Sequence, residues 1–199
     1  MISLPPTITS ITTTMFGNCN ALMELVIPYS VTSVATKAFT GCGAIQDLKF
    51  PAAVTSLGAE TFNGCMSMPH AEFIGNLTSL GSKVFYNCNS LKEFRAPSTI
   101  TAIPDSAFMN CSTLQRLAFE GDITSVGATA FSGCYGVRVF DFSHCTAVPT
   151  LSNVNAFANT PSTKQIIVPD ALYDTWILAD NWSSTTNNIK NCIVKASEA

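Results

Sequence analysis

Six cysteines recur along this chain at a constant interval of 23 residues, and this repetition constrains the fold more than any other feature. A phenylalanine column and a threonine column keep the same interval through the same six units. Such a unit cannot bury its apolar residues alone, so each must form one coil of a solenoid and pack against its neighbours. The columns are Cys19, Cys42, Cys65, Cys88, Cys111 and Cys134; Phe16, Phe39, Phe62, Phe85, Phe108 and Phe131; and Thr9, Thr32, Thr55, Thr78, Thr101 and Thr124.

The apolar spacing within one unit predicts where the coil is extended and where it turns. Leu91, Phe94 and Ala96 have the L-x-x-L-x-L spacing of a strand in a stacked parallel sheet. A proline such as Pro97 directly after this strand ends its backbone pairing. The β-branched run at residues 31–34 predicts a second short strand on the opposite side of the coil. The A-F-x-x-C segment that follows predicts a single helical or 3₁₀ turn.

The position before each cysteine of the column predicts a corner in the backbone. Only glycine and asparagine occur there, and these two residues most readily accept a positive φ. The column therefore predicts a left-handed corner that leads back into the sheet. Its members are Asn18, Gly41, Gly64, Asn87, Asn110 and Gly133.

These columns resemble the BspA-type leucine-rich repeat family, whose units read roughly V-T-S-I-x-x-x-A-F-x-x-C-x-x-L-x-x-L-x-I-P. The resemblance covers residues 4–141, and Pro69 and Ala71 depart from it in the third unit. It implies a mainly β or α/β solenoid: a right-handed leucine-rich-repeat superhelix with a parallel sheet on its concave face. Short second strands and helical turns are expected elsewhere, with a capping helix at the C-terminal end. We predict six tandem repeats in residues 1–141, followed in the same continuous domain by a degenerate seventh repeat and cap in 142–199.

The register of the repeat slips after Asp141. The Ala-Phe pair returns at 156–157, three residues late, and Thr160 takes the place of the cysteine. Residues 166–169 predict a final strand, and the segment DALYDTWILADNW predicts a helix across the open end of the core. This tail resembles the closing segment of many bacterial members of the family and of some phage structural proteins. The apolar residues of the predicted cap are Leu172, Trp176, Ala179 and, nearby, Trp182.

Composition excludes two classes of partner. Charged residues make up 12% of the chain, its net charge is −3, and no basic cluster follows the pattern of a phosphate backbone, so we expect no nucleic-acid ligand. Polar residues interrupt every apolar run well short of the roughly 20 residues of a membrane helix, so we expect no membrane insertion. The opening residues lack the pattern of a signal peptide, and we expect a fragment of a longer protein whose leader and N-terminal cap lie elsewhere.

The cysteine and histidine pattern does not point to chemistry. The cysteines have no C-x-x-C spacing, so we expect free, buried thiols that act as small hydrophobes. Cys145 and Cys192 lie outside the column, and a bond between them is left open. His70 falls on an outward sheet position and His144 in a turn, and neither has an Asp or Cys placed to form a triad. We predict no catalytic residue, no metal site and no cofactor.

The outward side of the predicted wide strands is the candidate binding face. Much of the scarce charge lies in its three columns, mixed in sign and without an aromatic anchor. The simpler interpretation, that outward strand positions are polar for solubility, stays open. The candidate residues are Gln46, Asp47, Lys49, His70, Glu72, Lys92, Glu93, Arg95, Gln115, Arg116, Arg138 and Asp141.

The family resemblance implies a non-catalytic protein-binding or adhesion module of a bacterial cell-surface or secreted protein. Its concave sheet face would bind a protein or glycan on a host or microbial surface. Two alternatives remain at this point: a phage tail or virion component that is structural or binds a receptor, and a structural spacer. The regular outward threonine column also suggests a surface that organises water. A ladder of threonines that hydrogen-bond along a pleated surface is sufficient to explain the column.

Overall fold

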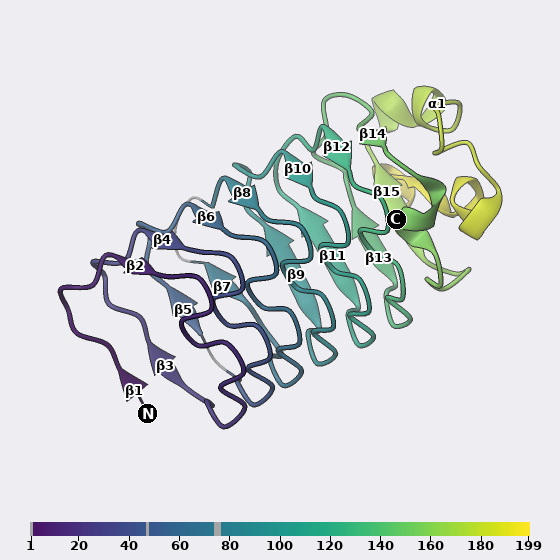
Figure 1. The fold of residues 1–199 in the computed structure, drawn as a ribbon. Helices are drawn as coiled ribbons and strands as arrows, with labels where there is room; N and C mark the ends of the chain where they lie inside the picture. Colours follow the sequence, from purple (N-terminus) through teal and green to yellow (C-terminus); the bar gives the residue numbers. More distant parts are fainter. Residues whose placement is uncertain (1, 47, 74–76) are drawn as a thin grey trace.

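The protein forms an elongated stack of coils that runs from the N-terminus to the C-terminal segment (Figure 1). The computed structural model describes residues 2–46, 48–73 and 77–199, without the side chains of Ile2, Glu72 and Phe73. Every paired strand lies parallel to its neighbour, and equivalent residues of successive repeats face each other: Arg116 lies opposite Glu93, one unit earlier. The solenoid expected from the repeat is therefore confirmed.

One side of the stack carries the wider strands, one from each coil. They pair as β1-β3, as β5-β7 and as the five-stranded order β16-β15-β13-β11-β9. Strands β15 and β16 continue the sheet beyond the regular repeats, and the sequence did not indicate β16. The bounds are β1 Ile2–Ser3, β3 Leu25–Val26, β5 Lys49–Phe50, β7 Glu72–Phe73, β9 Glu93–Ala96, β11 Arg116–Phe119, β13 Val139–Asp141, β15 Gln165–Val168 and β16 Ile193–Lys195.

A second strand, which has two residues in every coil and is called the narrow strand, pairs with its neighbours to form another side of the stack. The threonine column runs directly beside it, and its hydroxyl groups bond along the stack: Thr78 Oγ1 donates to the Thr55 carbonyl at 3.0 Å, and Thr124 Oγ1 to the Thr101 carbonyl at 2.9 Å. The expected hydrogen-bonded ladder is thus confirmed. The strands are β2 Ser10–Ile11, β4 Ser33–Val34, β6 Ser56–Leu57, β8 Ser79–Leu80, β10 Ala102–Ile103, β12 Ser125–Val126 and β14 Thr150–Leu151.

The segment between the narrow and wide strands is a series of tight turns. The Cys88 N–H donates to Phe85 O at 3.2 Å within the turn, whereas the Phe85 N–H donates to Ala107 O of the next coil at 2.8 Å. Because successive N–H groups alternate between these two directions, the segment does not become helical in the six regular units. A 3₁₀ helix, η1 (Val154–Phe157), takes its place in the seventh. The predicted corner is confirmed, with φ of 60° at Asn18 and 77° at Gly64.

Phenylalanine rings and cysteine thiols fill the interior column by column. The rings of Phe62 and Phe85 stack with centroids 5.4 Å apart and planes 8° apart. Each thiol of the column from Cys42 to Cys134 also donates to a phenylalanine carbonyl of the previous coil, as Cys88 Sγ does to Phe62 O at 3.1 Å. All eight cysteines are free, including Cys145 and Cys192. The expectation of burial is wrong for Cys19, which lies in the first of the described coils and is exposed.

Two indole rings close the C-terminal end of the core. Trp176 and Trp182 are fully buried, and their ring centroids lie 6.0 and 5.8 Å from that of Phe142. The Trp182 Nε1–H donates to the Pro149 carbonyl at 2.7 Å. The cap's helical part is shorter than expected, because α1 has only four residues (Figure 1). Its helices are η2 Asp170–Leu172, α1 Tyr173–Trp176, η3 Thr186–Asn188, η4 Lys190–Cys192 and η5 Ala196–Glu198.

Gly81 marks a close approach between two coils and yields a stability prediction. A Cβ atom there would lie 2.3 Å from Ala59 N and 2.4 Å from Gly58 C, both of which are backbone atoms. We expect Gly81→Ala to lower the free energy of unfolding by about 1–3 kcal/mol, because the coils must separate to admit the methyl group. Urea unfolding followed by circular dichroism measures this. Gly43→Ala is the matched control, since its Cβ would meet only Asn20 Oδ1, at 3.9 Å; an equal loss in both variants would contradict the prediction.

Candidate functional site

The outward face of the wide sheet carries most of the predicted site. Along β9, Phe94 and Ala96 are buried while Glu93 and Arg95 are exposed, which is the alternation of a strand with one face in the core. Strand β11 repeats the pattern, with Arg116 exposed and Ala118 half-buried, alternating with the buried Leu117 and Phe119. Because the register advances by one unit at each step, the outward side chains form columns across the coils.

The structure places most of the predicted residues on this face. Asp141 is half-buried, Asp47 lies outside the described residues, and only the backbone of Glu72 is described. The remaining nine are exposed: Gln46, Lys49, His70, Lys92, Glu93, Arg95, Gln115, Arg116 and Arg138.

A shallow hollow of about 630 Å³ lies on the N-terminal half of the face, and we call it the His70 hollow. Pro69 and Ala71 form part of its floor, and these are the residues that depart from the repeat in the third unit. Pro69 leaves room on the face because it is shorter than Gln46 and Lys92 of the same outward column, whereas Ala71 stands in the core-facing column of Leu48 and Phe94 and is half-buried. The hollow is lined by Gln46, Lys49, Pro69, His70, Ala71, Glu93 and Arg95.

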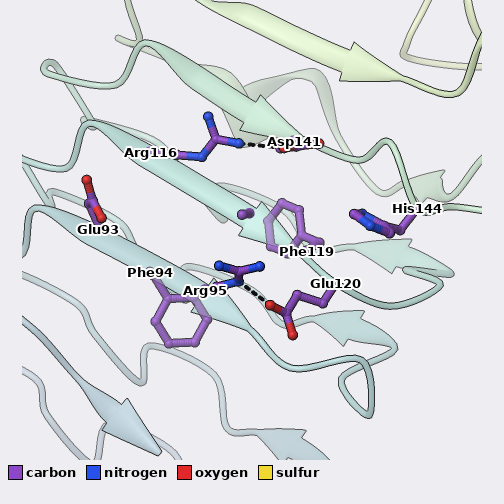
Figure 2. Close-up of a pocket in the computed structure, with 9 residues that line it drawn as sticks. Glu93, Phe94, Arg95, Arg116, Phe119, Glu120, Asp141 and His144 are labelled. Atoms are coloured by element: carbon purple, nitrogen blue, oxygen red, sulfur yellow. Dashed lines mark hydrogen bonds and ion pairs between the residues drawn. The ribbon is translucent and has the colours of Figure 1, made fainter. Parts of the chain in front are cut away.

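A second hollow of about 170 Å³ adjoins the first and shares Glu93 and Arg95 with it; we call it the Ala118 hollow (Figure 2). Two ion pairs border it. Arg116 Nη2 lies 2.6 Å from Asp141 Oδ2, and Arg95 Nε contacts Glu120 Oε1. The lining residues are Glu93, Phe94, Arg95, Arg116, Ala118, Phe119, Glu120, Asp141 and His144.

Sequence reasoning missed five residues of the Ala118 hollow: the core residues Phe94 and Phe119, and Ala118, Glu120 and His144. Ala118 lies in one of the three outward columns but carries no charge, and Glu120 follows it by two residues, so it continues the outward alternation beyond the end of β11. That alternation was the signal that could have identified Glu120. His144 was expected only to serve a turn, and its Nδ1 does lie 3.4 Å from the neighbouring Ser143 Oγ, but its ring also lines the hollow.

Lys92, Gln115 and Arg138 are exposed but line neither hollow. Each of them directly precedes a strand: the Gln115 N–H donates to Lys92 O at 2.7 Å, and the Arg138 N–H donates to Gln115 O at 2.8 Å. This column therefore frames the Ala118 hollow on one side, while two of its earlier members, Gln46 and Pro69, line the His70 hollow.

The ion pairs of the face are partly open to solvent, with 78% of the Arg95 side chain and 48% of the Arg116 side chain exposed. Such pairs stabilise a fold by about 0–1 kcal/mol each, so their main effect is to hold charges at defined positions. Within the described residues, no three His, Cys, Asp or Glu side chains gather as a metal site would require. None of the helices in the described part of the chain has the length and apolar character needed to cross a membrane.

Comparison with known proteins agrees with this architecture. The family model described as "BspA type Leucine rich repeat region (6 copies)" matches residues 1–115 and 55–175. A leucine-rich repeat protein from Bacteroides ovatus superposes with a TM-score of 0.67 at 23% identity, over 87% of this chain and 50% of that one. The leucine-rich repeat protein of T. pallidum superposes with a TM-score of 0.62 at 22% identity, over 68% of this chain and 77% of that one. No curated protein matches the chain. Because the family model spans most of its length, the chain belongs to the BspA-type leucine-rich repeat family.

Proposed function

We propose that this chain is a non-catalytic binding module that holds a protein ligand on the outward face of its wide sheet, at the surface of a bacterial cell. The observation that carries the proposal is the pair of adjoining hollows, which together span strands β5 to β13 and are bordered by charges of both signs. A face of mixed charge selects its partner by electrostatic complementarity and repels surfaces with the wrong pattern.

The position of Arg95 supports a binding role for this face rather than a role in solubility alone. Arg95 lines both hollows, and its guanidinium is paired with Glu120 although most of the side chain is exposed. A residue needed only for solubility would not need a fixed orientation. An arginine held at the boundary of two hollows is placed to contact any ligand that covers them.

A binding screen tests the proposal. The chain is presented to extracellular matrix proteins, glycans and bacterial cells, and the dissociation constant of each partner is measured for the wild type and for Arg95→Glu. We expect Arg95→Glu to weaken the binding of a protein partner by about tenfold or more. The substitution removes the cation that both hollows share and places a second negative charge beside Glu120.

Lys83→Glu is the control for net charge. Lys83 is exposed on the turn side of the solenoid, and Glu60 occupies the equivalent position one unit earlier with the same φ of 56°, so the fold accepts glutamate there. Its partner affinity should stay close to that of the wild type. If both variants weaken binding equally, or if no protein partner responds to Arg95→Glu, the proposed face is not the binding surface.

A further inference from the structure

The Ala118 hollow has a segregated arrangement of charge. Ala118 lies opposite Arg95 on β9 and opposite Asp141 on β13, while Arg116 and Glu120 lie two residues to either side of it along its own strand. These four charged residues therefore surround a methyl group, and we call them the charged diamond (Figure 2). The small side chain at the centre leaves the floor of the hollow open.

Around the charged diamond, the order of residues is Arg116, Asp141, Glu120 and Arg95. The two ion pairs, Arg116 with Asp141 and Arg95 with Glu120, join residues that are neighbours in this order. The two cations are neighbours as well, and so are the two anions. Within the diamond, one side is therefore positive and the other negative, which gives it a directed dipole; Glu93, which also lines the hollow beside Arg95 and Arg116, adds a carboxylate on the positive side.

The ion pairs leave both halves able to bind a ligand. A guanidinium carries five N–H donors, and the pair with Asp141 is made through a single nitrogen, Arg116 Nη2. Asp141 also accepts from the Ser143 N–H at 3.2 Å and from Ser143 Oγ at 2.7 Å through its other oxygen, which fixes the carboxylate in place. Most of the Arg95 side chain faces solvent. The two arginines are thus held in position and remain accessible, whereas 37% of the Glu120 side chain and 15% of the Asp141 side chain are exposed.

A ligand of one charge is attracted to one half of this rim and repelled by the other. A ligand that carries a carboxylate and an ammonium a few bonds apart matches both halves at once. The hollow has a volume of about 170 Å³, which admits a small polar group. An α-amino acid unit is such a group and carries both charges.

We propose that the Ala118 hollow binds the zwitterionic end of an α-amino acid unit, with its carboxylate on Arg95 and Arg116 and its ammonium on Glu120 and Asp141. This inference rests on the proposed binding role of the strand face and names the group recognised there. Glu93, which faces Arg116 across the register, and His144 complete the rim and limit the size of the ligand.

NMR titration of the full chain tests the inference, with the backbone amides of Ala118 and Glu120 as reporters. L-alanine is the first probe, and γ-glutamylalanine is the second, because it carries the same zwitterion on a larger molecule. We expect alanine to bind, and alaninamide and N-acetylalanine, which keep one charge each, to bind about tenfold more weakly or not at all. Binding of both zwitterions indicates a unit displayed on a larger molecule, whereas binding of alanine alone indicates the free amino acid. Equal binding of the singly charged probes, or no binding of either zwitterion, would overturn the inference.

Two variants separate the charge pattern from the charges themselves. The double variant Arg116→Asp with Asp141→Arg keeps the composition, the net charge and the possibility of an ion pair, but it makes the signs alternate around the diamond and so removes the dipole. Ala118→Leu keeps every charge and fills the floor. We expect the affinity for the zwitterion to fall at least about tenfold in both variants. Thermal unfolding of each variant checks that it is folded. Retained binding in either folded variant would contradict the assignment.

The same variants distinguish this inference from the proposed function. Suppose that Arg95→Glu weakens the binding of a protein partner while Ala118→Leu leaves that binding unchanged. In that case the face binds the partner without using the Ala118 hollow, and only the inference fails. If alanine binds the wild type while no protein partner responds to Arg95→Glu, the proposed function fails and the hollow is a small-molecule site.

Discussion

Raising the pH from 7 to 10 is expected to lower the free energy of unfolding by about 5–6 kcal/mol, a large part of the roughly 5–15 kcal/mol that stabilises a domain. The cause is the cysteine column. Burial raises the pKa of Cys65, Cys88 and Cys111 far above the ordinary thiol value of 9.0, and it raises the pKa of Cys134 to about 12. Burial also raises the pKa of Cys42 and of Cys145 to about 11, so these two thiols add to the effect of the other four. The column therefore makes the fold sensitive to alkali.

The sign follows from where the protons are held. Below pH 9 the thiols are protonated in both the folded and the unfolded state, so their contribution is fully present. Above pH 9 the unfolded chain releases these protons while the folded chain, whose thiol pKa values are raised, retains them. Each of the four thiols then favours unfolding by about 1.4 kcal/mol at pH 10. The stability continues to fall until the pH reaches the folded-state pKa values.

Urea unfolding at pH 7, 9 and 10 in the presence of a reductant measures this dependence. Cys111→Ala should reduce the dependence of the free energy of unfolding on pH by the contribution of one thiol. Val84→Ala shortens a buried side chain that does not titrate, so it should lower the free energy of unfolding equally at each pH. Burial lowers the pKa of Lys164, so the folded state binds its proton less tightly than the unfolded state does. This lysine therefore makes the free energy of unfolding rise with pH, opposite to the thiols. The variant Lys164→Met removes its contribution. A stability independent of pH up to 10 would contradict the prediction.

Removing an interior phenylalanine ring is expected to have the second large effect. Phe85 is fully buried, and its ring lies 5.4 Å from that of Phe62, 5.3 Å from that of Phe108 and 5.3 Å from that of Phe94. We expect Phe85→Ala to lower the free energy of unfolding by about 3–5 kcal/mol, because a cavity forms between coils that cannot collapse onto it. Coils interact only with their neighbours, so the loss weakens the connection between the two halves of the stack.

Phe16→Ala is the matched control for position in the stack. Phe16 is the first ring of the column and stacks on Phe39, with centroids 5.3 Å apart, and no ring of the column lies on its other side. In the same urea titration, Phe16→Ala should lower the free energy of unfolding clearly less than Phe85→Ala does. Equal losses at the two positions would show that ring stacking between coils does not dominate the stability.

The candidate site was predicted only in part. The repeat placed Glu93, Arg95 and Arg116 on the outward face because strand alternation depends only on position in the unit. It did not indicate that Ala118 would form the floor of a hollow, nor that Glu120 would belong to the rim. A hollow depends on the difference between neighbouring side chains on separate coils, and the pattern within one unit does not contain that difference.

The backbone shows the same division. The corner before each cysteine was predictable because only glycine and asparagine occur there, but a second left-handed column went unnoticed. It includes Lys37, Glu60 and Lys83, with φ between 56° and 58°, and these residue types give no sign of such a conformation.

The sequence by itself determined the coil, its period and the composition of its core, because residues at a fixed interval must lie over one another in a stack. Only the tertiary structure decided the second left-handed column. There the Glu60 N–H donates to Ser82 O of the next coil at 2.9 Å, and the Lys83 N–H donates to Asp105 O at 3.0 Å. These bonds between coils offset the cost of a strained backbone, and they exist only once the neighbouring coil is in place.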